Sequence, residues 1–277
     1  MNEEYFAAAS VEDADIVMIG LPFDGTVSFR PGTRFGPAAI RNVLYGIETY
    51  SPYQQTDMSE LDIFDYGDIE VPIGNTVRTL ELIEKTVTPF FQSGKKVLAL
   101  GGEHLVSLGV IRAALKKYSQ LTIIHFDAHV DMRDDYLGEK LSHSTVMRRA
   151  GELMGYSNIY QFGIRSGSKD EWDFAFSNSN IYPYKISDFY NVINSFSDGE
   201  PIYLTIDLDV LDPSYFPGTG TPEPCGISTR ELIDAIIAME EKNIIGADVV
   251  ELSPDYDPTG VSSVTAAHIV REVSMIL

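Results

Sequence analysis

Six apolar runs of strand length constrain the fold of this chain more than any other feature of its sequence. Each run is continuously apolar, which is typical of strands that are covered on both faces. Longer amphipathic stretches separate the runs, and strands that alternate with helices predict a mostly parallel sheet between layers of helices. The runs occupy residues 16–21, 96–101, 121–127, 158–164, 202–208 and 244–252.

Five amphipathic stretches carry the signals of helices. One opens with Pro37, a residue suited to the first helical turn, and another follows a capping box made by Ser228 and Glu231. The helices are expected at residues 37–47, 78–92, 108–118, 232–241 and 264–275.

Ligands of parallel α/β sheets bind beyond the carboxyl ends of the strands, so we expect the functional residues at these strand ends.

Length, charge and cysteine content exclude several classes of protein. The 277 residues contain no internal repeat and no linker rich in Ser or Pro, which favours a single domain over residues 1–277. With 20 basic and 41 acidic residues the net charge is −21, which argues against nucleic acid or an anionic membrane as a partner. No apolar run approaches the roughly 18 residues of a membrane span, and the acidic start differs from a secretory signal. A single cysteine excludes an internal disulfide and favours a cytoplasmic location.

Ligand-type side chains stand at the ends of four of the six apolar runs. A histidine follows run 96–101, alternating Asp and His residues end run 121–127, two aspartates end run 202–208, and a glutamate ends run 244–252. A spacing of two directs side chains to one side of an extended backbone, so these groups can converge. They are His104, Asp127, His129, Asp131, Asp207, Asp209 and Glu251.

Four aspartates and two histidines at one place predict a pair of divalent metal ions. Without metal the carboxylates would repel one another, and each unpaired buried charge would cost on the order of several kcal/mol. Two imidazoles and four carboxylates are too many ligands for one tetrahedral zinc ion. An oxygen-rich site with some imidazole favours Mn²⁺, with Zn²⁺, Fe²⁺ and Co²⁺ left open. Such ions bring the pKa of water from about 15.7 to about 7, which supplies a hydroxide nucleophile.

Four motifs in a fixed order make the chain resemble the ureohydrolase family, which contains arginase and agmatinase. They are GGEH, DAHVD, DLDVLDP and VELSP, each at the end of an expected strand. The segments GLPFDGTVSFRPGTRFGPAAIR, LSHST and PGTGTPEPCG resemble the agmatinase branch in particular. The resemblance covers the chain from about residue 14 to the expected C-terminal helix.

The resemblance implies a three-layer α/β/α fold with two Mn²⁺ ions per chain. It implies that His104, Asp127, Asp131 and Asp207 hold one ion, and that Asp127, His129, Asp207 and Asp209 hold the other. The implied activity is that of a hydrolase of linear C–N bonds, which splits agmatine into putrescine and urea in polyamine biosynthesis. The alternatives are another amidinohydrolase (guanidinobutyrase, formimidoylglutamase or arginase), a silent metal-binding scaffold, or a two-metal phosphoesterase. Family members are usually trimers or hexamers, so we expect a homo-oligomer.

Two further residues are expected to act on the substrate. Glu251 suits a planar guanidinium, because a carboxylate accepts paired N–H donors. His143, in the loop after DAHVD, suits proton transfer near neutrality or the positioning of the substrate. Ser144 stands where several relatives carry Gly, which bears on the fit of the substrate.

The loop between the last DAHVD aspartate and His143 contains Asp134, Asp135 and Glu139. These carboxylates either favour a substrate with an ammonium group or belong to a solvated acidic loop.

Three other features have simpler explanations. His125 is expected to be a buried structural histidine, and Gly101-Gly102 to allow close backbone packing around His104. Arg165 is placed outside the site, in an interface or a structural ion pair.

Overall fold

Eight parallel strands form the central sheet of the computed structural model, which describes residues 6–277. Their order is β4-β1-β5-β10-β9-β6-β7-β8, and all neighbours are parallel, which confirms the predicted sheet. Residues 1–5, part of the acidic start considered above, lie outside the described residues. The strands are β1 (Ile16–Leu21), β4 (Ile63–Asp68), β5 (Lys96–Gly101), β6 (Thr122–Phe126), β7 (Ile159–Ile164), β8 (Asn180–Pro183), β9 (Ile202–Asp207) and β10 (Ile244–Val250).

All six apolar runs are strands, and the sequence pattern missed only β4 and β8 among the strands of this sheet in residues 6–277. Both missed strands lie at the edges, where a strand has a single neighbour. β4 reads IFDYGD and is mostly half-buried or exposed, and β8 ends in Pro183. A search for continuously apolar runs therefore finds the interior strands and overlooks the edges.

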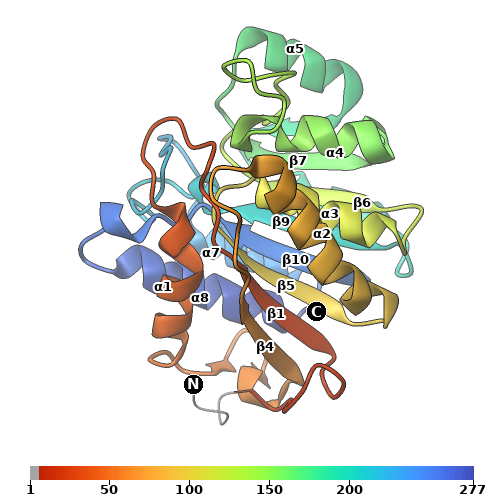
Figure 1. Ribbon diagram of the computed structural model, residues 1–277, viewed down its shortest axis with the longest axis vertical. Helices are drawn as coiled ribbons and strands as arrows, with labels where there is room; N and C mark the ends of the chain where they lie inside the picture. Colours follow the sequence, from red (N-terminus) through yellow and green to blue (C-terminus); the bar gives the residue numbers. More distant parts are fainter. Residues whose placement is uncertain (1–5) are drawn as a thin grey trace.

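Helices cover both faces of the sheet and complete the three-layer arrangement (Figure 1). One apolar core lies between the sheet and α1, α6, α7 and α8, and a second lies between the sheet and α2, α3, α4 and α5. Strand residues alternate between the two cores: Leu98 and Leu100 pack in the first, Val97 and Ala99 in the second. The helices are α1 (Gly36–Leu44), α2 (Thr76–Gln92), α3 (Val106–Leu115), α4 (Val146–Met154), α5 (Lys169–Asn178), α6 (Phe189–Ser195), α7 (Thr229–Ile237) and α8 (Val261–Ser274).

The five predicted helices are present, and α7 begins with the predicted capping box of Ser228 and Glu231. The sequence pattern missed α4, α5 and α6, which are 7 to 10 residues long. A short antiparallel pair, β2 (Tyr50–Ser51) and β3 (Thr56–Asp57), lies outside the main sheet. Among the helices of residues 6–277, none has the length and apolarity that crossing a membrane requires.

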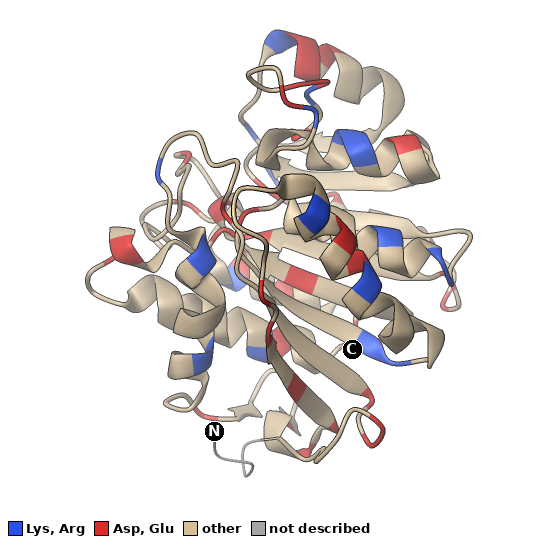
Figure 2. Ribbon diagram, viewed as in Figure 1, with Lys and Arg blue, Asp and Glu red and all other residues tan. Residues whose placement is uncertain are grey.

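The four strands that end in ligand-type residues are consecutive neighbours at the centre of the sheet, in the order β5-β10-β9-β6. Their ends are level, because Leu100 pairs with Val249, Val250 pairs with Asp207, and Ile206 pairs with Phe126. In Figure 2 red acidic segments lie together in the middle of the picture, where these strands run into their loops. The topology thus gathers residues that are far apart in the sequence at one place.

Candidate metal centre

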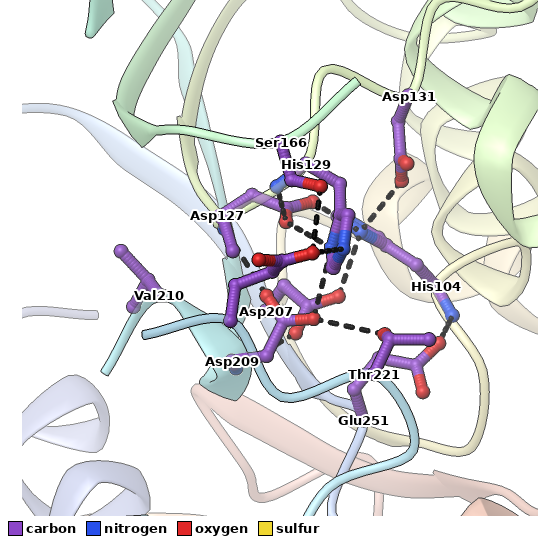
Figure 3. A network of polar contacts seen from close by, with 12 residues as sticks. His104, Asp127, His129, Asp131, Ser166, Asp207, Asp209, Val210, Thr221 and Glu251 are labelled. Atoms are coloured by element: carbon purple, nitrogen blue, oxygen red, sulfur yellow. Dashed lines mark hydrogen bonds and ion pairs between the residues drawn. The ribbon is translucent and has the colours of Figure 1, made fainter. Parts of the chain in front are cut away.

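His104 points into a group of three carboxylates just beyond the strand ends (Figure 3). Its Nδ1 atom lies 3.1 Å from Asp127 Oδ2, 3.3 Å from Asp131 Oδ2 and 3.3 Å from Asp207 Oδ2. All four residues are buried. One imidazole nitrogen and three carboxylate oxygens therefore face a single point from the ends of β5, β6 and β9.

His129 forms a second group beside the first. Its Nδ1 atom lies 3.0 Å from Asp209 Oδ2 and 3.5 Å from Asp127 Oδ1. Asp127 thus turns one oxygen to His104 and the other to His129. The structure brings together all six residues that the sequence predicted as ligands, and Asp127 has the geometry of a bridge.

The free nitrogen of His104 fits a metal ion. Its Nδ1 atom is buried without a hydrogen-bond partner, whereas Nε2 lies 2.9 Å from Thr205 Oγ1. Thr205 donates its own proton to Asp248 Oδ1 at 2.6 Å, so its oxygen accepts the Nε2 proton of His104. This arrangement leaves a lone pair on Nδ1, directed at the carboxylates, which is how histidine ligands are usually held.

His125 contacts the cluster but differs from the ligand-type histidines. Its Nε2 atom lies 2.8 Å from Asp127 Oδ2, and the Gln161 side-chain amide donates to its Nδ1 atom at 3.1 Å. Because Nδ1 accepts a proton from Gln161, Nε2 carries the proton and donates it to Asp127. Both ring nitrogens are thereby used within the protein, so His125 orients a carboxylate and has no lone pair left for a metal.

The buried carboxylates of the cluster carry an excess of negative charge, which favours the binding of protons or other cations. Burial raises the pKa of Asp207 well above its usual value, and the charges of Asp209 and Asp127 raise it further. Burial and the charge of Asp127 also raise the pKa of Asp131 to about 7. Although burial opposes it, the surrounding carboxylates raise the pKa of His129 well above its usual value. Without metal, bound protons compensate the negative charge of the buried carboxylates, and bound divalent ions would replace these protons.

A family comparison matches this chain over residues 14–276 to the model described as the arginase family. The chain belongs to the arginase family. An agmatinase of Bacillus subtilis is 49% identical over 265 residues, which cover 95% of this chain and 91% of that protein. A guanidinobutyrase of Pseudomonas aeruginosa is 32% identical over 97% of this chain and 88% of its own length. The crystal structure of a putative agmatinase from Clostridium difficile superimposes on this chain with a TM-score of 0.94 at 45% identity, and the match covers 96% of this chain and 98% of that one.

Glu251 enters the arginase-family site from the end of β10, next to the ligands. Its Oε1 atom accepts the backbone N–H of His104 at 2.8 Å, and the side chain lines a cavity of about 370 Å³ beside the cluster. Burial raises the pKa of Glu251 well above its usual value, and the charges of Glu103 and Asp209 add to this. A buried carboxylate without a cation suits a cationic ligand in the cavity, and this agrees with the predicted guanidinium site.

The close packing predicted around the Gly-Gly pair is confirmed. A Cβ atom on Gly102 would lie 2.0 Å from Phe23 O, and one on Gly101 would lie 2.4 Å from Val250 Cγ1. Glycine therefore lets the chain pass between Phe23 and β10 on its way to His104.

His143 and Ser144 also line the cavity, as the sequence analysis anticipated for substrate contacts. The backbone N–H of His143 donates to Thr26 Oγ1 at 3.1 Å, and His143 Nδ1 lies 3.3 Å from the same oxygen. Thr26 Oγ1 donates to Glu103 Oε1 at 2.5 Å. Burial lowers the pKa of His143 to about 4, with the charges of His129 and other cations acting in the same direction.

The acidic-loop hypothesis for substrate choice is not supported. Asp134, Asp135 and Glu139 are exposed, and none of them is among the residues that line the cavity. Asp134 forms an ion pair at 3.0 Å with Arg149. The loop is a solvated one, and the selectivity of the site has to come from other residues.

Among residues 6–277, Arg165 forms no ion pair, which differs from one of the two roles expected for it. Its guanidinium donates to backbone carbonyls, among them those of Asp209 at 2.7 Å, Val210 at 3.1 Å and Glu223 at 2.8 Å. It therefore ties two loops together next to a ligand-type aspartate.

The sequence analysis missed several residues of this region, and only some left a signal. Asp248 is a charged residue inside the apolar run of β10, and such a buried charge is informative. Glu171 sits in a Ser-x-x-Glu capping box at the start of α5, which the sequence displays. Arg133 and Thr26 carry no comparable pattern, because only the folded loops bring them to the cavity.

Proposed function

We propose that this arginase-family protein is an agmatinase, which hydrolyses the guanidinium group of agmatine to give putrescine and urea. The observation that carries the proposal is the cavity: it opens on a buried cluster of carboxylates and imidazoles and is lined by Glu251. The similarity to the Bacillus subtilis agmatinase, 49% against 32% for the Pseudomonas guanidinobutyrase, favours agmatine over other guanidino substrates. The principal alternative is another amidinohydrolase, such as a guanidinobutyrase, a formimidoylglutamase or an arginase.

Two divalent ions fit the donor set. The residues around the free Nδ1 atom of His104 would hold one ion, and those around His129 would hold the other, with Asp127 and Asp207 shared; Mn²⁺ suits this mixture of carboxylates and imidazoles. When bound, such ions supply an activated water and stabilise developing negative charge. The ligands would be His104, Asp127, Asp131 and Asp207 for the first ion, and Asp127, His129, Asp207 and Asp209 for the second.

Glu251 would bind and orient the guanidinium of the substrate. Its backbone contact with His104 keeps the carboxylate at the level of the metal ligands. Planar N–H donors match a carboxylate in paired hydrogen bonds, which fixes the orientation of the guanidinium carbon. Orientation of this kind contributes up to about 7–11 kcal/mol to catalysis in favourable cases.

His143 would accept a hydrogen bond or a proton from the reacting group. With a pKa of about 4 its imidazole is neutral near pH 7. While Glu103 is ionised it can only accept, so the Thr26 hydroxyl donates to Glu103 and Nδ1 of His143 donates to Thr26. Nε2 then carries the lone pair, which suits His143 to move a proton from the attacking water to the leaving amine or to hold the substrate.

We also propose that residues 1–277 form one domain, that the protein acts in the cytoplasm, and that it assembles as a trimer or hexamer. The continuous eight-stranded sheet within residues 6–277 supports the single domain, and the lone cysteine suits a reducing compartment. The oligomer rests on the family resemblance alone.

Urea release decides between the candidate substrates. The purified protein is loaded with Mn²⁺, its metal content is measured, and agmatine, arginine and 4-guanidinobutyrate are compared on the same sample. We expect about two ions per chain and the highest kcat/KM with agmatine. A preference for either carboxylate-bearing compound would contradict the agmatinase assignment.

A further inference from the structure

The cavity contains one ion pair that the proposed chemistry does not use. Arg133 Nε lies 3.0 Å from Glu171 Oε2, and both side chains line the cavity together with His143 and Glu251. The Arg133 guanidinium also lies over the ring of Tyr136, 4.7 Å from its centre, and this ring lines the same cavity. A cation and an anion thus stand beside the space that receives the substrate.

Local structure holds Glu171 firmly in this position. It is the third residue of the first turn of α5, where its side chain accepts the backbone N–H of Ser168 at 2.8 Å in a capping box. The positive end of the helix dipole stabilises a carboxylate at this point. The Glu171 side chain is 5% exposed, whereas that of Arg133 is 34% exposed. The carboxylate is therefore the buried partner, held by the capping box, and the guanidinium is the more exposed one.

Glu171 differs in its contacts from the other carboxylates that line the cavity. The lining residues Asp131 and Asp207 face His104 in the metal cluster, and Glu251 is the proposed guanidinium site. Glu171 is the lining carboxylate that has neither of these tasks. An Arg133 without a partner would attract substrates whose tail ends in a carboxylate, because guanidinium pairs strongly with carboxylate.

We propose that Glu171 is a specificity-determining residue, and this inference rests on the proposed hydrolysis of agmatine. By pairing with Arg133 it cancels the positive charge beside the substrate tail. The cavity then accepts guanidino compounds with an ammonium tail and discriminates against those with a carboxylate tail. Selectivity in this protein thus comes from an anion that masks a cation. Masking removes a repulsion from the ammonium tail and an attraction from the carboxylate tail.

The substitution Glu171→Gln tests the proposal. Glutamine keeps the shape of the side chain and an oxygen for the Ser168 N–H in the capping box, but it removes the charge. The measured quantity is the ratio of kcat/KM for agmatine to kcat/KM for 4-guanidinobutyrate, at matched metal content. We expect the ratio to fall at least tenfold, because the unmasked Arg133 repels the ammonium and attracts the carboxylate. A purely structural role of Glu171 would lower both values together and leave the ratio unchanged, which would overturn the proposal.

Three further variants make the result independent of folding defects. Glu152→Gln and Asp134→Asn each remove a carboxylate that pairs with Arg149 at 3.0 Å outside the cavity lining, and we expect no change of the ratio. Arg133→Gln leaves Glu171 uncompensated and should raise the ratio, so it carries the test if Glu171→Gln fails to fold.

The possible failures are distinguishable. A fall of the ratio in Arg133→Gln, or an equal shift in the two control variants, would refute charge masking. A wild-type protein that releases urea from agmatine, combined with an unchanged ratio in Glu171→Gln, defeats this inference alone. Absence of agmatine hydrolysis by the wild-type protein defeats the proposed function and this inference with it.

Discussion

The hydroxyl of Thr205 connects the cluster of carboxylates and imidazoles to the interior of the sheet, and its removal gives the sharpest test of how His104 is held. Thr205 accepts the Nε2 proton of His104 and donates to Asp248, which also accepts the hydroxyl proton of Tyr203 at 2.6 Å. The substitution Thr205→Val keeps the volume and the β-branched shape that suits a strand but deletes this link. His104 Nε2 and Asp248 Oδ1 then lose their partner at once.

The expected magnitude follows from burial. His104 is 1% exposed and Asp248 is 0% exposed, so water cannot replace the lost hydroxyl. Each buried polar group left without a partner costs about 1–3 kcal/mol, so the free energy of unfolding should fall by about 2–6 kcal/mol. Because the proton on Nε2 is no longer fixed, the lone pair on Nδ1 is no longer guaranteed, and metal affinity should fall by about 10–100-fold.

Metal titration by calorimetry on the metal-free protein, followed by urea unfolding with and without Mn²⁺, measures both effects. Tyr203→Phe is the matched control, because it removes the other hydrogen bond of Asp248 but leaves the contact of Thr205 with His104 intact. We expect it to lower stability by about 1–3 kcal/mol while metal affinity stays within about twofold of the wild type. Wild-type affinity in Thr205→Val, or an equal loss in Tyr203→Phe, would refute the reasoning.

Three other predictions concern the same region. Asp127→Asn should weaken both metal ions and abolish urea release, whereas Asp209→Asn should weaken mainly the ion beside His129; equal stoichiometry in the two variants by metal analysis would contradict the bridging role. Glu251→Gln should lower kcat/KM for agmatine by at least 10²-fold with both ions still bound, and loss of the ions would show that Glu251 has another task. Burial raises the pKa of Glu103 from 4.5 to about 7, so its contribution to stability is present below pH 4.5 and is lost as the pH rises through 7. Urea unfolding of metal-free Glu103→Gln should show a loss between pH 4.5 and 8 that is smaller than the wild-type loss by about 3 kcal/mol, and identical pH profiles would refute this.

The interior strands of the sheet could be predicted from the sequence, because strands that are buried on both faces have continuously apolar sequences. The runs at 16–21 and 96–101 coincide with β1 and β5. The edges could not be predicted in this way, since β4 and β8 have one neighbour each and carry Asp and Pro side chains. The helices α4 to α6 were missed because their apolar stripes are weak: α5 and α6 bury only two residues each, and the buried face of α4 includes Arg149 and Gly151.

The ligand-type residues could be predicted because they follow the strands directly, and parallel strands end at one edge of the sheet. The residues that form the other walls of the cavity could not be predicted in this way. Arg133 and Glu171 belong to a loop and a helix that meet only after folding, and the acidic residues Asp134 and Asp135 looked more suitable in the sequence although they face solvent. Local pattern therefore locates the ligand-type residues but not the other residues that line the cavity.

Backbone geometry shows why the cluster depends on the whole fold. Asp131 and Glu251 both adopt positive φ angles, 54° and 67°, in the region that favours glycine. Such conformations cost of order 1–3 kcal/mol each and persist only where the surroundings fix them. Here the carbonyl of Asp131 accepts the N–H groups of Met147 at 3.1 Å and Arg148 at 3.2 Å in the first turn of α4, and the N–H of Glu251 donates to Gly102 O at 2.9 Å. Contacts with α4 and with Gly102 thus hold two residues with strained backbones in place, Asp131 beside the His104 ring and Glu251 at the His104 backbone N–H, which the strand ends alone would not do.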